Sequence, residues 1–185
     1  MIKIVIIHGN GGSTADSCWV PWLKAELEKQ SFSVCTPTMP DNFYAKASIW
    51  LPYMESELQC NEKTIVIGHS SGAVAAMRYA ENHKLLGSVL IGASYTDLES
   101  EIERISGYFI TPWLWDKIKT NQQWIIQLAS TDDPFIPINQ ARHIHKNLGT
   151  KYHEFSNKGH FLDNTLPKAL STLLNKLAHH CPTST

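Results

Sequence analysis

Apolar runs rich in β-branched residues alternate along the chain with longer segments of mixed polarity. Residues 64–68 and 85–92 are apolar at almost every position, which is typical of parallel strands covered on both faces. The run at 151–155 is mixed and is expected at an edge of the sheet. This alternation predicts βαβ units and a parallel sheet. The expected strands are residues 2–7, 32–35, 64–68, 85–92, 124–130 and 151–155.

Helical periodicity between these runs predicts helices on both faces of the sheet. Trp19, Leu23 and Leu27 recur at i+4 steps. Apolar residues between 43 and 58 also share one helical face, although Pro52 should kink or split that helix because proline removes a backbone donor. The last expected helix carries the stripe Leu166, Leu170, Leu173 and Leu177.

Residues 96–120 fit this scheme least well, because the segment is longer than an ordinary connection and rich in aromatic residues. It forms either a small cap or a surface helix that packs its aromatic side chains onto the domain. As a cap, it would bring Phe109, Trp113 and Trp115 into a substrate pocket. No internal repeat or linker is visible, so we expect one domain over residues 1–178 and a frayed tail over 179–185.

Composition and charge narrow the classes of partner. A chain of 185 residues is long enough for one domain with a sizeable core. Its 16 basic and 17 acidic residues give a formal net charge of -1, so no general field attracts nucleic acid or an anionic membrane. We therefore expect small molecules or peptides as partners, and neither nucleic acid nor a membrane.

The cysteines and the first apolar run indicate the compartment. The four cysteines are scattered and form no C-x-x-C pair, which suggests neither a disulfide framework nor a zinc cluster. The histidines at 179–180 lie too close to the terminus for a good metal site. The apolar run at 4–7 is too short for a signal-peptide core or a membrane span. These features predict a cytoplasmic protein with reduced thiols and no metal.

A G-x-S-x-G motif, formed by Gly68, Ser70 and Gly72, directly follows the strand at 64–68 and precedes a helical segment. In this context the turn holds the serine in a strained conformation with its hydroxyl facing out, and the small flanking residues avoid clashes. Ser71 would fall in the first helical turn, with its hydroxyl along the helix. Ser70 is therefore the expected nucleophile, and an ordinary strand-to-helix turn is the alternative.

Candidate partners for this serine follow the fifth and sixth expected strands. A serine hydroxyl needs a histidine base, and the histidine needs a carboxylate. Asp132 and Asp133 follow residues 124–130, and His160 follows residues 151–155, in the chain order of α/β-hydrolases. Asp133 is favoured because it begins "DPFIP", whose prolines would stiffen the loop. The histidines at 8 and 69 lie near the site but precede the acid, so we expect them either to support the catalytic residues or to be structural.

The glycine-rich sequence "HGNGG", residues 8–12, follows the first expected strand and can supply backbone amides to an oxyanion. In α/β-hydrolases one donor is the amide after the nucleophile, here Ser71, and the other comes from this loop. Asn10 is the expected second donor, with Gly11 as the alternative. A phosphate loop is disfavoured, because the spacing matches neither G-x-G-x-x-G nor the Walker pattern.

These motifs resemble the retinoblastoma-binding protein 9 family of small serine hydrolases over nearly the whole chain. The resemblance covers "HGNGG", "SIWLPYMESELQCNEKTIVIGHSSGAVAAMRYAE", "SGYF", "STDDPF" and "GHF". It implies a compact α/β-hydrolase without the large lid of lipases, with nucleophile, acid and base at Ser70, Asp133 and His160. The expected fold is thus a single α/β-hydrolase-like domain of about six mostly parallel strands, with helices on both faces and at most a small cap.

The family name also points to an L-x-C-x-E motif, which Leu58, Cys60 and Glu62 supply as "LQCNE". To engage a retinoblastoma-type pocket protein, such a motif must be presented as an extended, exposed peptide. Leu58 lies on the apolar face of its expected helix, and Glu62 is two residues from a buried strand. The residues therefore favour a structural connection between helix and strand.

Two functions follow from the sequence. The first is an enzyme without a cofactor that cleaves small carboxylic esters or amides through an acyl-Ser70 intermediate, with aromatic or aminoacyl groups as candidate substrates. Transfer of the acyl group to another acceptor uses the same residues and stays open. The second is a non-catalytic binding protein that engages a pocket protein through "LQCNE". The complete set of catalytic residues favours the enzyme.

Overall fold

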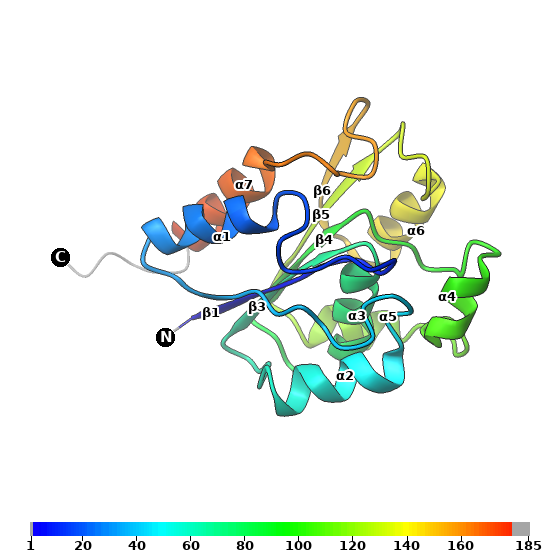
Figure 1. Ribbon diagram of the computed structural model, residues 1–185. Helices are drawn as coiled ribbons and strands as arrows, with labels where there is room; N and C mark the ends of the chain where they lie inside the picture. Colours follow the sequence, from blue (N-terminus) through cyan, green and yellow to red (C-terminus); the bar gives the residue numbers. More distant parts are fainter. Residues whose placement is uncertain (1, 179–185) are drawn as a thin grey trace.

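A six-stranded, wholly parallel sheet forms the centre of the computed structural model, which describes residues 2–178 (Figure 1). The strand order is β2-β1-β3-β4-β5-β6, so the mixed sixth strand lies at an edge, as its pattern predicted. The expected tail at 179–185 lies outside the described residues. The strands are β1 (Lys3–Ile7), β2 (Ser33–Cys35), β3 (Thr64–His69), β4 (Gly87–Ile91), β5 (Ile125–Ser130) and β6 (Lys151–Phe155).

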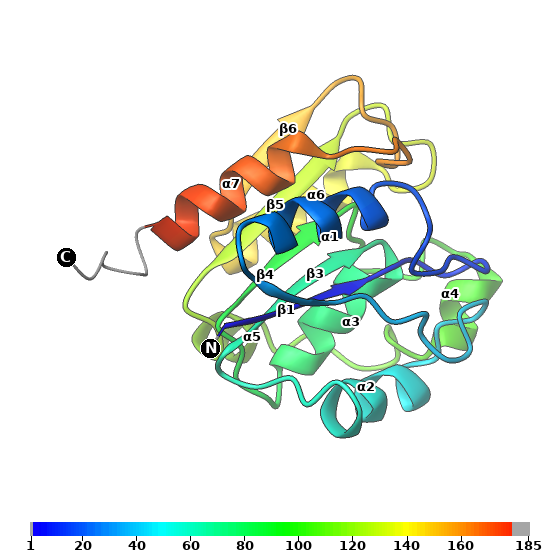
Figure 2. The ribbon, with the colours of Figure 1, turned by 60° about the vertical axis from the view of Figure 1, so that its left-hand side comes forward.

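Helices cover both faces of the sheet, which confirms the predicted fold class. Figures 1 and 2 show α1 and α7 together on one face and α2, α3 and α5 on the other. Within residues 2–178, no helix has the length and apolar character needed to cross a membrane. The helices are α1 (Val20–Lys29), α2 (Ala47–Ser56), α3 (Ser71–Ala80), α4 (Glu101–Ser106), α5 (Trp115–Thr120), α6 (Ile138–Leu148) and α7 (Pro167–Ala178).

Alternate residues of the strands contribute to two separate cores. In β1, Val5 and Ile7 pack with residues of α2, α3 and α6, whereas Ile4 and Ile6 pack with residues of α1 and α7. This follows from the period of two along a strand, which directs successive side chains to opposite faces. Because β1, β3, β4 and β5 are buried on both faces, they form a rigid base for the loops at their carboxyl ends.

Helix α2 differs from the expectation for residues 43–58. Pro52 lies inside the helix, which continues to Ser56 and is not split. The proline is exposed, so the helix loses one backbone donor without bringing the ring into the core. Phe43, which we expected on the buried face, precedes the helix and is 50% exposed. Trp50 and Met54 provide the buried contacts of α2 instead.

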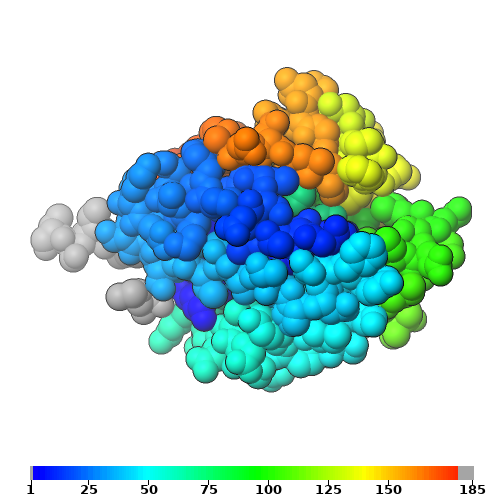
Figure 3. All heavy atoms as spheres, viewed as in Figure 1, coloured from blue at the N-terminus to red at the C-terminus, as the bar shows by residue number. Residues whose placement is uncertain are grey.

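The short helix α4 lies beyond the carboxyl ends of the strands in Figure 1. In the space-filling view its segment, coloured green, forms one end of the molecule (Figure 3). The segment 96–120 therefore divides into two parts, because its first half includes α4 and its second half includes α5, which lies on a face of the sheet beside α3. Only the first half is placed as a small cap would be.

Candidate active site

Ser70 lies at a sharp turn between β3 and α3. Its φ of 53° and ψ of -118° are strained for a residue with a side chain. The turn depends on its two glycines: a Cβ on Gly68 would lie 2.4 Å from the carbonyl carbon of Gly72, and one on Gly72 would lie 2.3 Å from the carbonyl oxygen of Ile7. Strand, turn and helix thus have the context in which G-x-S-x-G exposes a nucleophile.

Ser71 is the first residue of α3, as its position in the motif predicted. The residue is 2% exposed, and its hydroxyl has no hydrogen-bond partner among the described residues. Its side chain is therefore less accessible than that of Ser70, which is only partly buried.

Asp133 and His160 are joined by a hydrogen bond of 2.7 Å between Oδ2 of the carboxylate and Nδ1 of the ring. Their side chains are 2% and 9% exposed. The other oxygen of Asp133, Oδ1, accepts the N–H groups of Phe135 at 2.9 Å and Ile136 at 3.0 Å. The carboxylate is thus held from both sides and directed at the ring, the geometry expected of an acid that orients a catalytic histidine.

Asp132, in the same loop, bonds to other groups than Asp133 does. Its Oδ1 accepts the hydroxyl of Ser130 and the N–H groups of Lys158 and Gly159 at 3.2 Å and 3.0 Å. The hydrogen bond from Ser130 is the main cause that lowers the pKa of the Asp132 carboxyl below its usual value. Asp132 therefore ties its loop to the segment that leads into His160, whereas Asp133 alone contacts the ring.

Two other histidines, His69 and His8, form hydrogen bonds with backbone groups around the site. The Nε2–H of His69 donates to the carbonyl oxygen of His160 at 2.8 Å, and burial lowers the pKa of His69 to about 4. His8 bonds the carbonyl of Gly9 through Nδ1 and accepts the N–H of Met39 through Nε2. Both side chains are buried, and their hydrogen bonds join backbone groups around the site.

The glycine-rich loop after β1 runs close to Ser70. A Cβ on Gly9 would lie 3.2 Å from Cβ of Ser70, so the peptide between Gly9 and Asn10 lies directly beside the nucleophile turn. Among residues 2–178, the backbone N–H groups of Asn10 and Ser71 donate no hydrogen bond. Two unpaired donors near one hydroxyl are the arrangement that an oxyanion requires.

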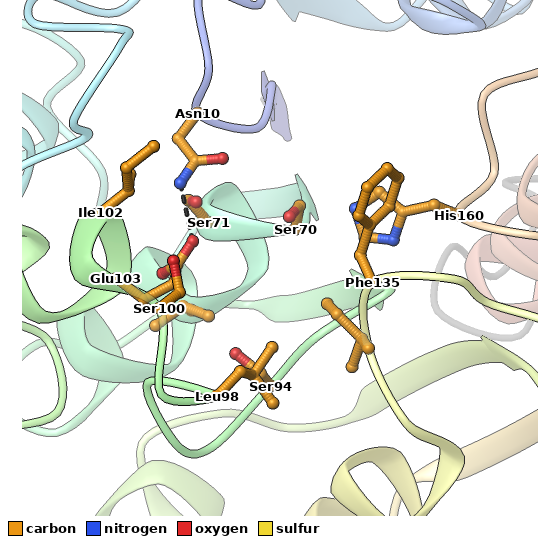
Figure 4. A pocket seen from close by; sticks show the side chains of 12 residues that line it. Asn10, Ser70, Ser71, Ser94, Leu98, Ser100, Ile102, Glu103, Phe135 and His160 are labelled. Carbon is orange, nitrogen blue, oxygen red and sulfur yellow. Dashed lines mark hydrogen bonds between the residues drawn. The ribbon is translucent and has the colours of Figure 1, made fainter.

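A cavity of about 340 Å³ opens between these groups. Figure 4 shows Ser70 and His160 on facing sides of it, with Asn10 and Glu103 on the wall nearest Ser71. The Ser70 hydroxyl forms no hydrogen bond within the described chain, and therefore none with His160. Catalytic hydrogen bonds often form fully only when substrate is bound. The lining comprises Asn10, Ser70, Ser71, Val74, Ser94, Leu98, Ser100, Ile102, Glu103, Phe135, Ile136 and His160.

The expected pocket residues lie elsewhere. Trp113 and Trp115 stack with ring centroids 5.4 Å apart, and the Arg78 guanidinium covers Trp113 at 3.6 Å. Phe109 packs edge-on against Trp113. This cluster covers α3 because a buried arginine there offers a cation to stack on, so the assignment of these aromatic residues to the cavity is corrected.

The apolar wall of the cavity comes instead from Leu98, Ile102, Phe135 and Ile136. Phe135 and Ile136 could have been found, because they follow the proposed acid directly in "DPFIP". Leu98 and Ile102 come from the start of the segment considered as a cap: Leu98 precedes α4 with a φ of 53°, and Ile102 lies in the first turn of α4, so no helical period relates the two positions. Glu103, the one acid of the lining, had no signal in the sequence.

Residues of "LQCNE" connect α2 to β3. Leu58 and Cys60 are 4% and 7% exposed, whereas Gln59, Asn61 and Glu62 are exposed. The carbonyl of Leu58 accepts Nζ of Lys3, and that of Cys60 accepts the Tyr79 hydroxyl. Burial raises the pKa of the Cys60 thiol to about 12. In this conformation the segment is a structural connection rather than an exposed peptide.

No cluster of three or more His, Cys, Asp or Glu side chains suited to a metal ion occurs in the described part of the chain. The cavity lining contains Ser70, His160 and Glu103 as its reactive or ionisable side chains, with Asp133 behind His160. The chemistry that these residues can perform is acyl transfer by a serine with a histidine base.

Comparison with known proteins agrees with this geometry. The crystal structure of the ydeN gene product from Bacillus subtilis superposes with a TM-score of 0.88 at 22% identity, covering 96% of this chain and 100% of that one. Est1E from Butyrivibrio proteoclasticus has a TM-score of 0.78 at 11% identity, covering 96% of this chain and 87% of the other. Both show the same α/β-hydrolase-like fold.

Comparison of the sequence, in addition to the fold, identifies the family. Serine hydrolase RBBP9 of Rattus norvegicus is 50% identical over 161 residues, which are 86% of this chain and 87% of the relative. This agrees with the resemblance drawn from the motifs. The family model described as serine hydrolase matches residues 4–169, and the chain therefore belongs to the serine hydrolase family.

Proposed function

We propose that this serine hydrolase cleaves small carboxylic esters or amides through an acyl-Ser70 intermediate, with His160 as the base and Asp133 as the group that orients it. The observation that carries the proposal is the 2.7 Å hydrogen bond from His160 to the buried Asp133, at a cavity that Ser70 lines from the facing side. An acid bonded to Nδ1 leaves Nε2 as the nitrogen that can take a proton from the serine.

In the acylation step, the Ser70 oxygen bonds to the substrate carbonyl carbon while its proton moves to Nε2 of His160. The negative charge on the carbonyl oxygen is stabilised by the N–H groups of Asn10 and Ser71. The bond to the leaving alcohol or amine then breaks, and the leaving group takes the proton from His160. In the second step, water attacks the acyl carbon and gives a proton to His160. The bond from the acyl carbon to Ser70 then breaks, His160 returns the proton to the Ser70 oxygen, and the acid is released.

The cavity favours a small acyl group with an apolar part. Its volume is about 340 Å³, and Leu98, Ile102 and Phe135 form the apolar wall. The Phe135 ring lies edge-on to His160 with centroids 5.2 Å apart and lines the cavity, so a flat acyl group beside Ser70 would lie near an aromatic ring. A structure of Est1E holds bound ferulic acid, an aromatic acid. We therefore include aromatic acyl groups, and aminoacyl amides, among the candidate substrates.

Three described cysteines, Cys18, Cys35 and Cys60, are unpaired, which fits a reducing compartment such as the cytoplasm. The proposed steps use only side chains and backbone amides of this chain. They involve no cofactor.

A fluorophosphonate probe tests the proposal, because it forms a stable bond only with an activated serine. We expect labelling of the folded protein, with the adduct on the peptide that contains Ser70. Ser48→Ala, an exposed serine on α2, is the matched control and should label like the wild type. Absence of labelling, or an adduct on another serine, would contradict the proposal. A screen of acyl esters and aminoacyl amides then defines the substrate.

A further inference from the structure

One hydrogen bond fastens the glycine-rich loop to the cap on the cavity side. Nδ2 of Asn10 donates to Oε1 of Glu103 at 2.7 Å, joining residues that lie 93 positions apart in the chain. Figure 4 shows the bond on the cavity wall, opposite His160. Glu103 belongs to α4, whereas Asn10 belongs to the loop after β1, so the bond crosses from one element to the other.

The loop needs such a tie because of its two following glycines. Gly11 and Gly12 have φ values of 68° and 85° and no neighbouring atom in the space where a Cβ would lie. Their N–H groups bond the carbonyls of Phe43 and Asn42 in the segment that precedes α2. These bonds hold the tip of the loop. The peptide beside Ser70 is held at the Gly9 carbonyl by Nδ1 of His8 and, on its other side, by the Asn10 side chain.

Glu103 contacts the glycine-rich loop and takes no part in the proposed proton transfers. Burial raises the pKa of its carboxyl, and the nearby Asp97 adds to the rise, while the hydrogen bond from Asn10 and the nearby His160 oppose it. One carboxylate oxygen is occupied by Asn10, and the segment after β5 supplies the acid that contacts His160. Glu103 is thus a partly buried acid that the proposed catalytic steps do not use.

Building on the proposed function, we propose that Glu103 is a positioning residue for the oxyanion hole. Its carboxylate holds the Asn10 side chain, and this fixes the backbone N–H of Asn10 toward the position where the substrate oxygen becomes negative. The hole is then set by two elements at once: the start of α3 fixes the Ser71 amide, and α4 fixes the Asn10 amide. A donor must lie within hydrogen-bond distance of the oxyanion to stabilise it, so a small displacement is enough to slow the reaction.

Removing the bond from either end tests this role. Glu103→Ala and Asn10→Ala each abolish the hydrogen bond but leave the Asn10 backbone N–H in the chain. We expect each to lower kcat by about 10- to 100-fold, with a smaller change in KM, since removal of a whole oxyanion donor costs about 100- to 1000-fold. The double variant should be no slower than the slower single one, because both remove the same contact.

Two further variants separate positioning from general damage. Glu103→Gln keeps an acceptor oxygen for Asn10, so it should recover most of the rate that Glu103→Ala loses. Glu101→Ala removes an exposed acid from the same helix and should retain the wild-type rate. Thermal unfolding of each variant establishes that the compared samples are folded.

A thionoester substrate gives a readout that a purely structural role would not change. Sulfur is a weak hydrogen-bond acceptor, so an oxyanion hole accelerates an ester more than its thionoester. Loss of the hole should therefore reduce the oxygen-to-sulfur ratio of kcat/KM. We expect this ratio to fall in Glu103→Ala and Asn10→Ala, and to stay near the wild-type value in Glu103→Gln and Glu101→Ala.

The outcomes distinguish the inference from the function on which it rests. Equal slowing of the ester and the thionoester in Glu103→Ala, or a rate equal to that of Glu101→Ala, would overturn the role of Glu103 while the hydrolase reaction stands. Additive effects in the double variant would overturn it as well. A wild-type protein without Ser70-dependent turnover would overturn both.

Discussion

The carboxylate of Asp133 and the ring of His160 form a buried pair, joined at 2.7 Å between Oδ2 and Nδ1. Gly92, at the end of β4, lies against the same pair: a Cβ there would be 3.2 Å from Cε1 of His160. The ring therefore has little freedom to turn, and its Nδ1 is committed to the acid. This leaves Nε2 to exchange protons with Ser70 in the proposed reaction.

Replacing the acid by its amide should slow turnover severely. Asp133→Asn preserves the shape of the side chain but favours the wrong tautomer of His160 and removes the charge that stabilises the imidazolium. We expect kcat to fall by up to about four orders of magnitude, as for the acid of a serine-protease triad. The measurement is kcat with one ester substrate, at matched folded fraction.

Asp132→Asn is the matched control, because it makes the same change at the neighbouring position. Its oxygen would still face the N–H groups of Lys158 and Gly159 but without the charge that strengthens those bonds. We expect stability to fall more than the rate. A larger fall in kcat at position 132 than at position 133 would exchange the roles of the two acids.

The adjacent serines of the motif give a second prediction. Ser70→Ala should abolish turnover and fluorophosphonate labelling and leave the fold intact, because the turn itself depends on Gly68 and Gly72. Ser71→Ala should keep much of the activity, since the proposed contribution of Ser71 is its backbone amide. An inactive Ser71 variant beside an active Ser70 variant would reverse the assignment. Both rates are measured with circular dichroism as a check on folding.

The parts of the fold that the sequence predicted well are those with strong local patterns. Residues 64–68 and 85–92 read as doubly covered strands because nearly every position is apolar, and both are central strands in the sheet. The sequence also predicted that Ser70, Asp133 and His160 lie close together, because each follows a strand and parallel strands bring their carboxyl ends to one edge of the sheet. Local pattern and chain order were sufficient to predict that these three residues lie around one cavity, and their catalytic roles stay a prediction.

The cap could not be predicted in the same way. Trp113 packs on Arg78, which lies 35 positions earlier in the chain, and no local period reveals that pairing. The bond between Asn10 and Glu103 spans a still longer separation. Aromatic content indicated that the segment 96–120 packs against something, but the direction in which it packs depends on these distant partners.

Leu58→Ala gives a third prediction, on stability. Leu58 is 4% exposed in the core beside α2 and α3, so its truncation should lower the free energy of unfolding by about 2 to 5 kcal/mol. Glu57→Ala, at the exposed neighbouring position, should change it by less than about 0.5 kcal/mol. Urea unfolding followed by fluorescence measures both.

Leu58→Ala, with two further variants of the motif, tests the alternative function, the binding of a retinoblastoma-type pocket protein through "LQCNE". Burial of Leu58 and Cys60 predicts that the folded protein does not present this motif. The opposite interpretation would gain support from a pull-down in which the stable, folded protein binds a pocket protein and loses binding in Cys60→Ala and Glu62→Ala. It would also require Leu58→Ala to leave stability unchanged.

His69 gives a fourth prediction, on the dependence of stability on pH. Its folded pKa is about 4, lowered mainly by burial and further by His160, against an ordinary value of 6.5. Above pH 6.5 the ring is neutral in both the folded and the unfolded chain, so it contributes nothing. As pH falls from 6.5 toward 4, the unfolded chain binds a proton that the folded protein does not, and stability is lost across this window.

Comparison of the wild type with His69→Gln isolates this contribution. Glutamine retains an N–H donor for the carbonyl of His160 but does not titrate, whereas the other histidines are the same in both proteins. Between pH 7.5 and pH 5, the free energy of unfolding should therefore fall by about 2 kcal/mol less in His69→Gln than in the wild type. Urea unfolding at both pH values measures the difference. An equal fall in the two proteins would mean that His69 is protonated in the folded state, and the neutral donor assigned to it beneath His160 would have to be replaced by a charged one.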